Sequence, residues 1–162
     1  MHDSPLHVLL VEDDDSHAMI VEKGFRWAGQ PGTIDRVCDG VEAVAYVKRQ
    51  GHYHDRPRPH LILLDLKLPR MNGHQVLEIL KGDDHFKTMP IVVLTTSDAD
   101  DDAHQAYSLH ANSYLVKPVN FDEFRQLIRA VSSYWGVWNR AREQNNEVAD
   151  GIQFSLRGGR EA

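Results

Sequence analysis

Five short apolar runs alternate with segments of helical periodicity along this chain, and this alternation constrains the fold more than any other feature. Runs of this length are typical of strands; they are His7–Val11, Thr33–Val37, Leu61–Leu64, Ile91–Leu94 and Ser113–Val116. The predicted helices span Asp15 to about Trp27, Val41–Gln50, His74–Lys81, Ala99–Leu109 and Phe121 to about Arg142. Such alternation predicts an α/β fold, in which five helices cover both faces of a five-stranded parallel sheet. Because crossovers are right-handed, the sheet should be doubly wound.

Polar and charged residues follow four of the five predicted strands, at the point where each strand ends. In chain order they are Glu12-Asp13-Asp14-Asp15, Asp65, Thr95-Thr96-Ser97 and Lys117-Pro118. In a doubly wound sheet, ligands bind beside the carboxyl ends of the strands, near the point where the strand order reverses. We therefore expect these residues to lie together in one site.

The expected site combines carboxylates with a lysine and a threonine. Neighbouring carboxylates repel one another, and their titrations are coupled. A hard divalent cation that prefers oxygen ligands, Mg²⁺ above all, relieves this repulsion. A metal, a cation, a hydroxyl and a carboxylate acceptor are the groups that stabilise a transferring phosphoryl group. Asp65 is therefore predicted to take up phosphate as an acyl phosphate; the alternative is an aspartate that only caps the turn after its strand.

Composition narrows the classes of function. The 162 residues suit one domain, and a formal net charge of −6 argues against a nucleic-acid partner, because phosphate contacts need concentrated Lys and Arg. The single cysteine, Cys38, is expected to be a buried strand residue in a reducing cytoplasm. No apolar run reaches the length of a membrane span, so no membrane partner is expected. Residues 1–142 should form the domain, and residues 143–162 a tail.

Four motifs resemble those of response regulator receiver domains, the phosphoacceptors of two-component systems. They are VED, LLDLKLPRMNG, VLTTSDA and YLVKP, at the ends of the first, third, fourth and fifth predicted strands. This resemblance extends to about residue 138. It implies a flavodoxin-like sheet with the strand order 2-1-3-4-5, and a cytoplasmic signalling protein that receives phosphate from a histidine kinase. The loop GHYHDRPRP, residues 51–59, lengthens the interval between the first and third motifs relative to the small chemotaxis regulator.

The resemblance also assigns roles in the site. Asp65 would be the phosphoacceptor, and Lys117 would pair with the phosphoryl group. Mg²⁺ would be held by Asp13, by Glu12 through a water, by Asp65 and by the backbone carbonyl of Lys67.

Further residues would report the phosphorylated state. Thr95 would be the switch hydroxyl, and Tyr114, three residues before Lys117, matches the aromatic switch position. The peptide bond between Lys117 and Pro118 resembles a cis bond of the family.

Two rival functions fit the sequence less well. Phosphohydrolases that form an aspartyl phosphate commonly have a second aspartate two positions after the nucleophile, where this chain has Lys67. A degenerate receiver that acts as a scaffold is disfavoured, because all the site positions are intact. A phosphorelay intermediate or phosphate sink stays open as an alternative. The 20 residues from 143 to 162 are not expected to form a DNA-binding domain.

A narrower resemblance concerns the partner. LTTSDAD, ANSYLVKPVNFDEF and a long final helix with Tyr-Trp are similar to response regulators that act with phytochrome-type histidine kinases. This resemblance implies a light-sensing kinase as the source of phosphate.

The last predicted helix carries two overlapping apolar stripes. Phe124, Ile128, Val131 and Trp135 have the spacing of a stripe that packs on the sheet. The second stripe is Leu127, Val131, Tyr134 and Trp138. One stripe suffices for the core, so the second predicts a homodimer through the fourth helix, fifth strand and fifth helix; packing under the tail or the loop at 51–59 is the alternative.

Overall fold

The computed structural model of the protein describes residues 5–29 and 31–139. Five parallel strands form one sheet in the order β2-β1-β3-β4-β5. The strands are β1 (Leu6–Val11), β2 (Gly32–Val37), β3 (Leu61–Leu64), β4 (Ile91–Thr95) and β5 (Ser113–Val116). Each strand end lies within one residue of its predicted position, which confirms the doubly wound, flavodoxin-like sheet.

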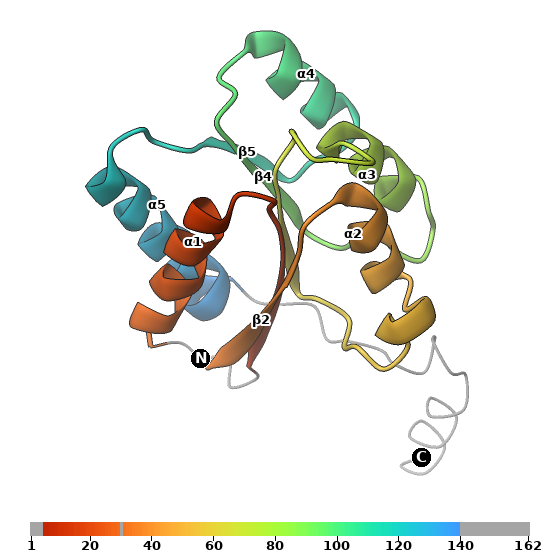
Figure 1. Ribbon diagram of the computed structural model, residues 1–162, viewed down its shortest axis with the longest axis horizontal. Helices are drawn as coiled ribbons and strands as arrows, with labels where there is room; N and C mark the ends of the chain where they lie inside the picture. Colours follow the sequence, from red (N-terminus) through yellow and green to blue (C-terminus); the bar gives the residue numbers. More distant parts are fainter. Residues whose placement is uncertain (1–4, 30, 140–162) are drawn as a thin grey trace.

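Five α-helices cover the two faces of this sheet (Figure 1). They are α1 (Asp15–Trp27), α2 (Gly40–Val47), α3 (Gly73–Lys81), α4 (Asp100–Ser108) and α5 (Phe121–Ser133). Helices α1 and α5 pack together on one face, and α2, α3 and α4 lie on the other. A 3₁₀ turn, Gly51–Tyr53, follows α2, and a π-helical turn, Tyr134–Trp138, follows α5.

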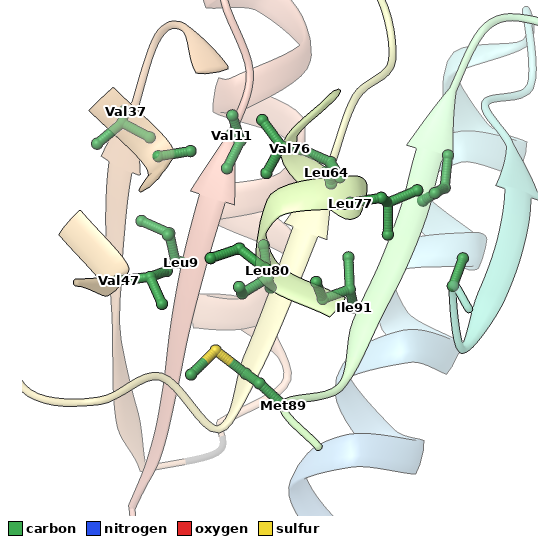
Figure 2. Close-up of a cluster of buried hydrophobic side chains, with 14 of the residues drawn as sticks. Leu9, Val11, Val37, Val47, Leu64, Val76, Leu77, Leu80, Met89 and Ile91 are labelled. Atoms are coloured by element: carbon green, nitrogen blue, oxygen red, sulfur yellow. The ribbon is translucent and has the colours of Figure 1, made fainter. Parts of the chain in front are cut away.

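The sheet separates two apolar cores. Every residue of β1 and β3 is buried, as expected for strands that are covered on both faces. Leu9 and Val11 contribute to the core beneath α2 and α3, together with Leu77 and Leu80 (Figure 2). Side chains that alternate with these along the strands contribute to the second core, beneath α1 and α5. The two cores thus fix the middle strands from both faces, and this also fixes the positions of the strand ends.

The end of α5 differs from the sequence prediction. A helix was expected to about Arg142, but α5 ends at Ser133 and the π-helical turn ends at Trp138. The N–H of Asn139 donates to the Tyr134 carbonyl at 2.6 Å, and the backbone at Asn139 is extended. Gly136 lies in this turn, and glycine weakens an α-helix by about 1 kcal/mol relative to alanine. The predicted tail, residues 143–162, lies outside the described residues.

Two other predictions are corrected near β2 and α2. Cys38 is exposed and not buried in β2, because the strand ends at Val37 and the chain turns into α2. Helix α2 ends at Val47 and not at Gln50, since Arg49 has a left-handed backbone with φ of 58°. Over residues 5–29 and 31–139, no helix has the length and apolar character needed to cross a membrane.

Candidate functional site

Three carboxylates converge at the carboxyl ends of the two central strands. Glu12 and Asp13 directly follow β1, and Asp65 directly follows β3. One oxygen from each lies within 4.8 Å of the others. Glu12 and Asp65 are buried, whereas Asp13 is exposed. Within the described parts of the chain, these three form the one group of His, Cys, Asp or Glu residues close enough to share a metal ion, and the histidines at 52, 54 and 60 form no such group.

Lys117 directly follows the edge strand β5 and brings a positive charge into this cluster. Its Nζ lies 2.5 Å from Glu12 Oε1 and 3.3 Å from Asp65 Oδ2. The lysine side chain is 1% exposed. The backbone N–H of Lys117 donates to the Thr95 carbonyl at 2.7 Å, so the pairing of β5 with β4 continues to Lys117 and sets the direction of its side chain.

The charges of the cluster suit a divalent cation. Three carboxylates and one ammonium group leave a net charge of −2 when all are ionised. Burial raises the pKa of Glu12, and the charge of Asp65 adds to this shift, whereas the hydrogen bond and the charge of Lys117 oppose it. An oxygen-only donor set with an exposed side fits Mg²⁺, which keeps several waters and takes one or two carboxylates from a protein. The residues present therefore fit the metal that the sequence predicts.

Backbone contacts hold the carboxylates in position. The N–H of Leu66 donates to Asp65 Oδ1 at 2.7 Å, and the N–H of Gly73 donates to the Leu66 carbonyl at 2.9 Å. Arg36, on β2, donates from Nε to the Glu12 carbonyl at 2.9 Å. Its Nη2 also lies 2.9 Å from Asp15 Oδ1, so the guanidinium ties the acidic loop to the neighbouring strand.

The predicted switch residues lie at the ends of β4 and β5. Thr95 is fully buried, and the N–H of Ser97 lies 3.4 Å from its Oγ1. The hydroxyl of Tyr114 donates to the Ser97 carbonyl at 3.0 Å, and partial burial raises the pKa of this tyrosine. The loop after β4 thus connects the threonine with the tyrosine.

Two further predicted positions lie on the loops that follow β3 and β4. Lys67 and Thr96 are both exposed there. The expected cis bond before Pro118 is wrong, because every peptide bond among the described residues is trans. The trans form is the ordinary one for X-Pro bonds, by about 0.5–1 kcal/mol, and only the family resemblance had favoured cis.

Two residues near the site had no signal in the sequence. His17 Nδ1 lies 3.0 Å from Lys117 Nζ, across 100 positions of the chain. Arg36 reaches the acidic loop from β2. Neither belongs to a motif at a strand end, and only the packing of α1 and β2 beside β1 brings them to the site.

The second apolar stripe of the last helix is only partly exposed to solvent. Val131 is buried, and Leu127 packs against the core beneath α1 and α5. Tyr134 is 54% exposed and Trp138 is 77% exposed. Of the predicted interface residues, these two aromatic side chains are therefore the ones available to a partner.

Comparison with known proteins agrees with this geometry. The family model of the response regulator receiver domain matches residues 8–129. The probable methanogenesis regulatory protein FilR2 of Methanothrix harundinacea is 41% identical over 139 residues, which cover 86% of this chain and 89% of that protein. Response regulator Rcp1 of Synechocystis is 37% identical over 131 residues, 81% of this chain and 89% of Rcp1.

Solved structures give the same result. The phosphorylated cyanobacterial phytochrome response regulator RcpA superposes with a TM-score of 0.84 at 34% identity, over 86% of this chain and all of that one. The Mn²⁺-bound form of Rcp1 has a TM-score of 0.83 at 35% identity, with the same coverage. The chain therefore belongs to the response regulator receiver domain family and is a phosphoacceptor signalling protein that a histidine kinase phosphorylates.

Proposed function

We propose that Asp65 is the phosphoacceptor and that phosphorylation requires Mg²⁺ at Glu12, Asp13, Asp65 and the backbone carbonyl of Lys67. One observation carries the proposal: Lys117 Nζ lies 3.3 Å from Asp65 Oδ2 within the group of three carboxylates. The Mn²⁺-bound form of Rcp1 and the phosphorylated form of RcpA support this reading, since both are relatives of this chain.

The transfer is a displacement at phosphorus. A carboxylate oxygen of Asp65 forms the new P–O bond while the P–N bond of the kinase's phosphohistidine breaks, and the imidazole leaves with the electron pair of that bond. Lys117 pairs its ammonium group with the negative oxygens of the phosphoryl group. Bound Mg²⁺ would supply Lewis acidity and neutralise charge on those oxygens. The hydroxyl of Thr95 then turns to a phosphoryl oxygen and reports the new state to Tyr114.

The proposed partner is a phytochrome-type histidine kinase. The names of RcpA and of the bacteriophytochrome response regulator RtBRR support this partner; RtBRR is 28% identical over 98% of this chain. We expect the transfer to take place in the cytoplasm, where a histidine kinase meets its ATP. The output is a homodimer contact through α4, β5 and α5, with Tyr134 and Trp138 at its centre.

The first experiment is phosphorylation with a phytochrome-type histidine kinase and labelled ATP. Wild-type protein should take up one phosphoryl group with Mg²⁺ present and none with a chelator. Asp65→Asn should remove the uptake, because the amide cannot form the acyl phosphate. Uptake by Asp65→Asn at the wild-type level would show that another residue is the acceptor.

A further inference from the structure

We infer that His17 is a positioning residue for phosphoryl transfer, which holds the ammonium group of Lys117 beside Asp65 through a bond that does not depend on the metal. This inference rests on the proposed function of Asp65 and Lys117. Lys117 Nζ has three hydrogen-bonding partners, which are Glu12 at 2.5 Å, His17 at 3.0 Å and Asp65 at 3.3 Å.

A lysine ammonium group has three N–H donors and no acceptor. Here the three donors face three acceptors, and the lysine side chain is almost completely buried. Because Lys117 can only donate, Nδ1 of His17 must accept. This bond requires the imidazole tautomer that carries its proton on Nε2.

A bound cation would affect the three hydrogen bonds of Lys117 differently. Glu12 and Asp65 belong to the carboxylate group that fits a divalent ion, so the metal and the lysine compete for their oxygens. Asp65 also changes when it carries phosphate. His17 takes no part in that carboxylate group. It is thus the partner of Lys117 that stays the same before metal binding, with metal bound and after phosphorylation.

Holding this ammonium group has a direct effect on the reaction. A lysine head is a point charge on a flexible four-carbon stem, and freezing that stem costs about 2 kcal/mol of rotamer entropy. When the metal weakens the bonds to the carboxylates, His17 keeps Nζ within reach of the oxygens that gain charge. Preorganised charge of this kind stabilises a transition state without reorganisation during the reaction.

Two contacts fix the imidazole so that Nδ1 faces Lys117. His17 lies in the first turn of α1, and its backbone N–H donates to the carboxylate of the N-cap residue Asp14 at 3.0 Å. Its ring meets the buried ring of Phe124, on α5, edge to face at 5.8 Å between centroids. The helix cap sets the backbone and the phenyl ring sets the side chain, so the acceptor is built into the fold.

Three substitutions at position 17 separate the acceptor from the rest of the side chain. In His17→Asn, Oδ1 is bonded to Cγ as Nδ1 is, and so the acceptor keeps its place. In His17→Gln, the acceptor moves one bond outward, to about the place of Nε2. His17→Leu fills a similar volume without an acceptor.

The experiment measures phosphorylation of the full chain by acetyl phosphate. Three quantities are determined separately: the rate constant at saturating donor, the donor concentration at half-saturation and the Mg²⁺ affinity. For His17→Leu and His17→Gln, the rate constant should fall about tenfold, the effect of one hydrogen bond to a charged group. His17→Asn should recover most of that loss. Mg²⁺ affinity, donor half-saturation and the thermal midpoint should stay within about twofold or a few degrees of wild type.

The possible failures are distinct. Wild-type protein that takes up no phosphate, or Asp65→Asn that takes up as much as wild type, would overturn the proposed function itself. If wild type is phosphorylated at Asp65 and His17→Leu reacts at the wild-type rate, the role of His17 is wrong and the proposed function stands. A loss of rate that is equal in the Leu and Asn variants, or that follows a loss of stability, would also overturn the positioning role.

Discussion

The backbone of Gly73 lies against the carbonyl oxygen of Asp65, so closely that a Cβ atom at position 73 could not be accommodated. Such an atom would lie 2.8 Å from Leu66 Cα and closer still to the Asp65 oxygen. The start of α3 is thus packed onto the residue that carries the proposed phosphoacceptor group. We predict that Gly73→Ala lowers the free energy of unfolding by about 1–3 kcal/mol, the usual cost of overpacking, and slows phosphorylation of Asp65.

The matched control for this prediction is Gly51→Asn. Gly51 has φ of 60° and no atom within 4 Å of a Cβ added there, and asparagine tolerates that backbone conformation. Urea unfolding should show little change for the control and a lower midpoint for Gly73→Ala. Equal stability of Gly73→Ala and wild type would mean that the loop relaxes without cost.

A second prediction concerns a partly buried chain of hydrogen bonds at the other end of the sheet. Tyr46 donates its hydroxyl proton to Asp35, so its oxygen accepts from His7 Nε2 at 2.8 Å. Nδ1 of His7 then accepts from the Thr33 hydroxyl at 2.6 Å. A neutral His7 satisfies this chain without placing a charge on a buried imidazole. Burial lowers the pKa of His7 below 6.5, and nearby His60 and Arg56 lower it further, whereas Asp35 opposes the shift.

The sign of the pH effect follows from this lowered pKa. In the unfolded chain His7 binds its proton near pH 6.5, and in the folded protein only at lower pH. The contribution of His7 to stability is therefore complete above its unfolded-state pKa of 6.5. This contribution is lost as the pH falls through the lower, folded-state pKa. Between about pH 7.5 and about pH 5.5, the free energy of unfolding should fall more for wild type than for His7→Gln, which does not titrate. Parallel pH profiles for the two proteins would contradict the role of His7.

A third prediction concerns the residue after the switch threonine. Thr96 is exposed and directly follows β4, and we expect its side chain to add bulk near an incoming phosphodonor. Thr96→Ala should therefore raise the rate of uptake from acetyl phosphate several-fold, a change of about 1 kcal/mol in the barrier. Thr96→Ser, which keeps the hydroxyl and loses only the methyl group, is the control for bulk. An unchanged or slower rate for Thr96→Ala would show that access is not what this residue limits.

The lifetime of the acyl phosphate should be long for a receiver domain. Lys67 offers neither a carboxylate nor an amide to orient a water, and the Ser97 hydroxyl is already bonded to Asp102 at 2.5 Å. Asp102→Ala would free that hydroxyl, and we expect faster loss of label from phosphorylated protein after removal of the kinase. A half-life that stays at the wild-type value would leave Ser97 without a role in hydrolysis.

The dimer prediction depends on two exposed aromatic side chains, Tyr134 and Trp138. Changing both to Asp should raise the dissociation constant of the homodimer at least about tenfold, because buried aromatic residues carry much of the energy of an interface. Leu127 is a poor probe, since it also packs against the core. Sedimentation at tens of micromolar should show a dimer for wild type and a monomer for the double variant. Wild type that sediments as a monomer with and without phosphate would exclude this interface.

The sequence by itself determined the sheet and the residues at its strand ends. Apolar runs buried on both faces leave little choice of secondary structure, and parallel strands bring their carboxyl ends to one edge. Glu12, Asp13, Asp65 and Lys117 were therefore predictable as neighbours, although up to 105 positions separate them. The same local signals failed where they are weak, at Cys38 and at the end of α5.

Only the tertiary structure decided which other side chains reach that edge. His17 meets Lys117 because α1 packs against α5, where Gly24 lets Ile128 approach closely, and Arg36 meets Glu12 because β2 pairs with β1. No periodicity or spacing encodes such contacts, since they depend on the rotation of a helix and the register between strands. The strand ends follow from patterns of burial along the chain, whereas the contacts that position their side chains follow from how separate elements pack.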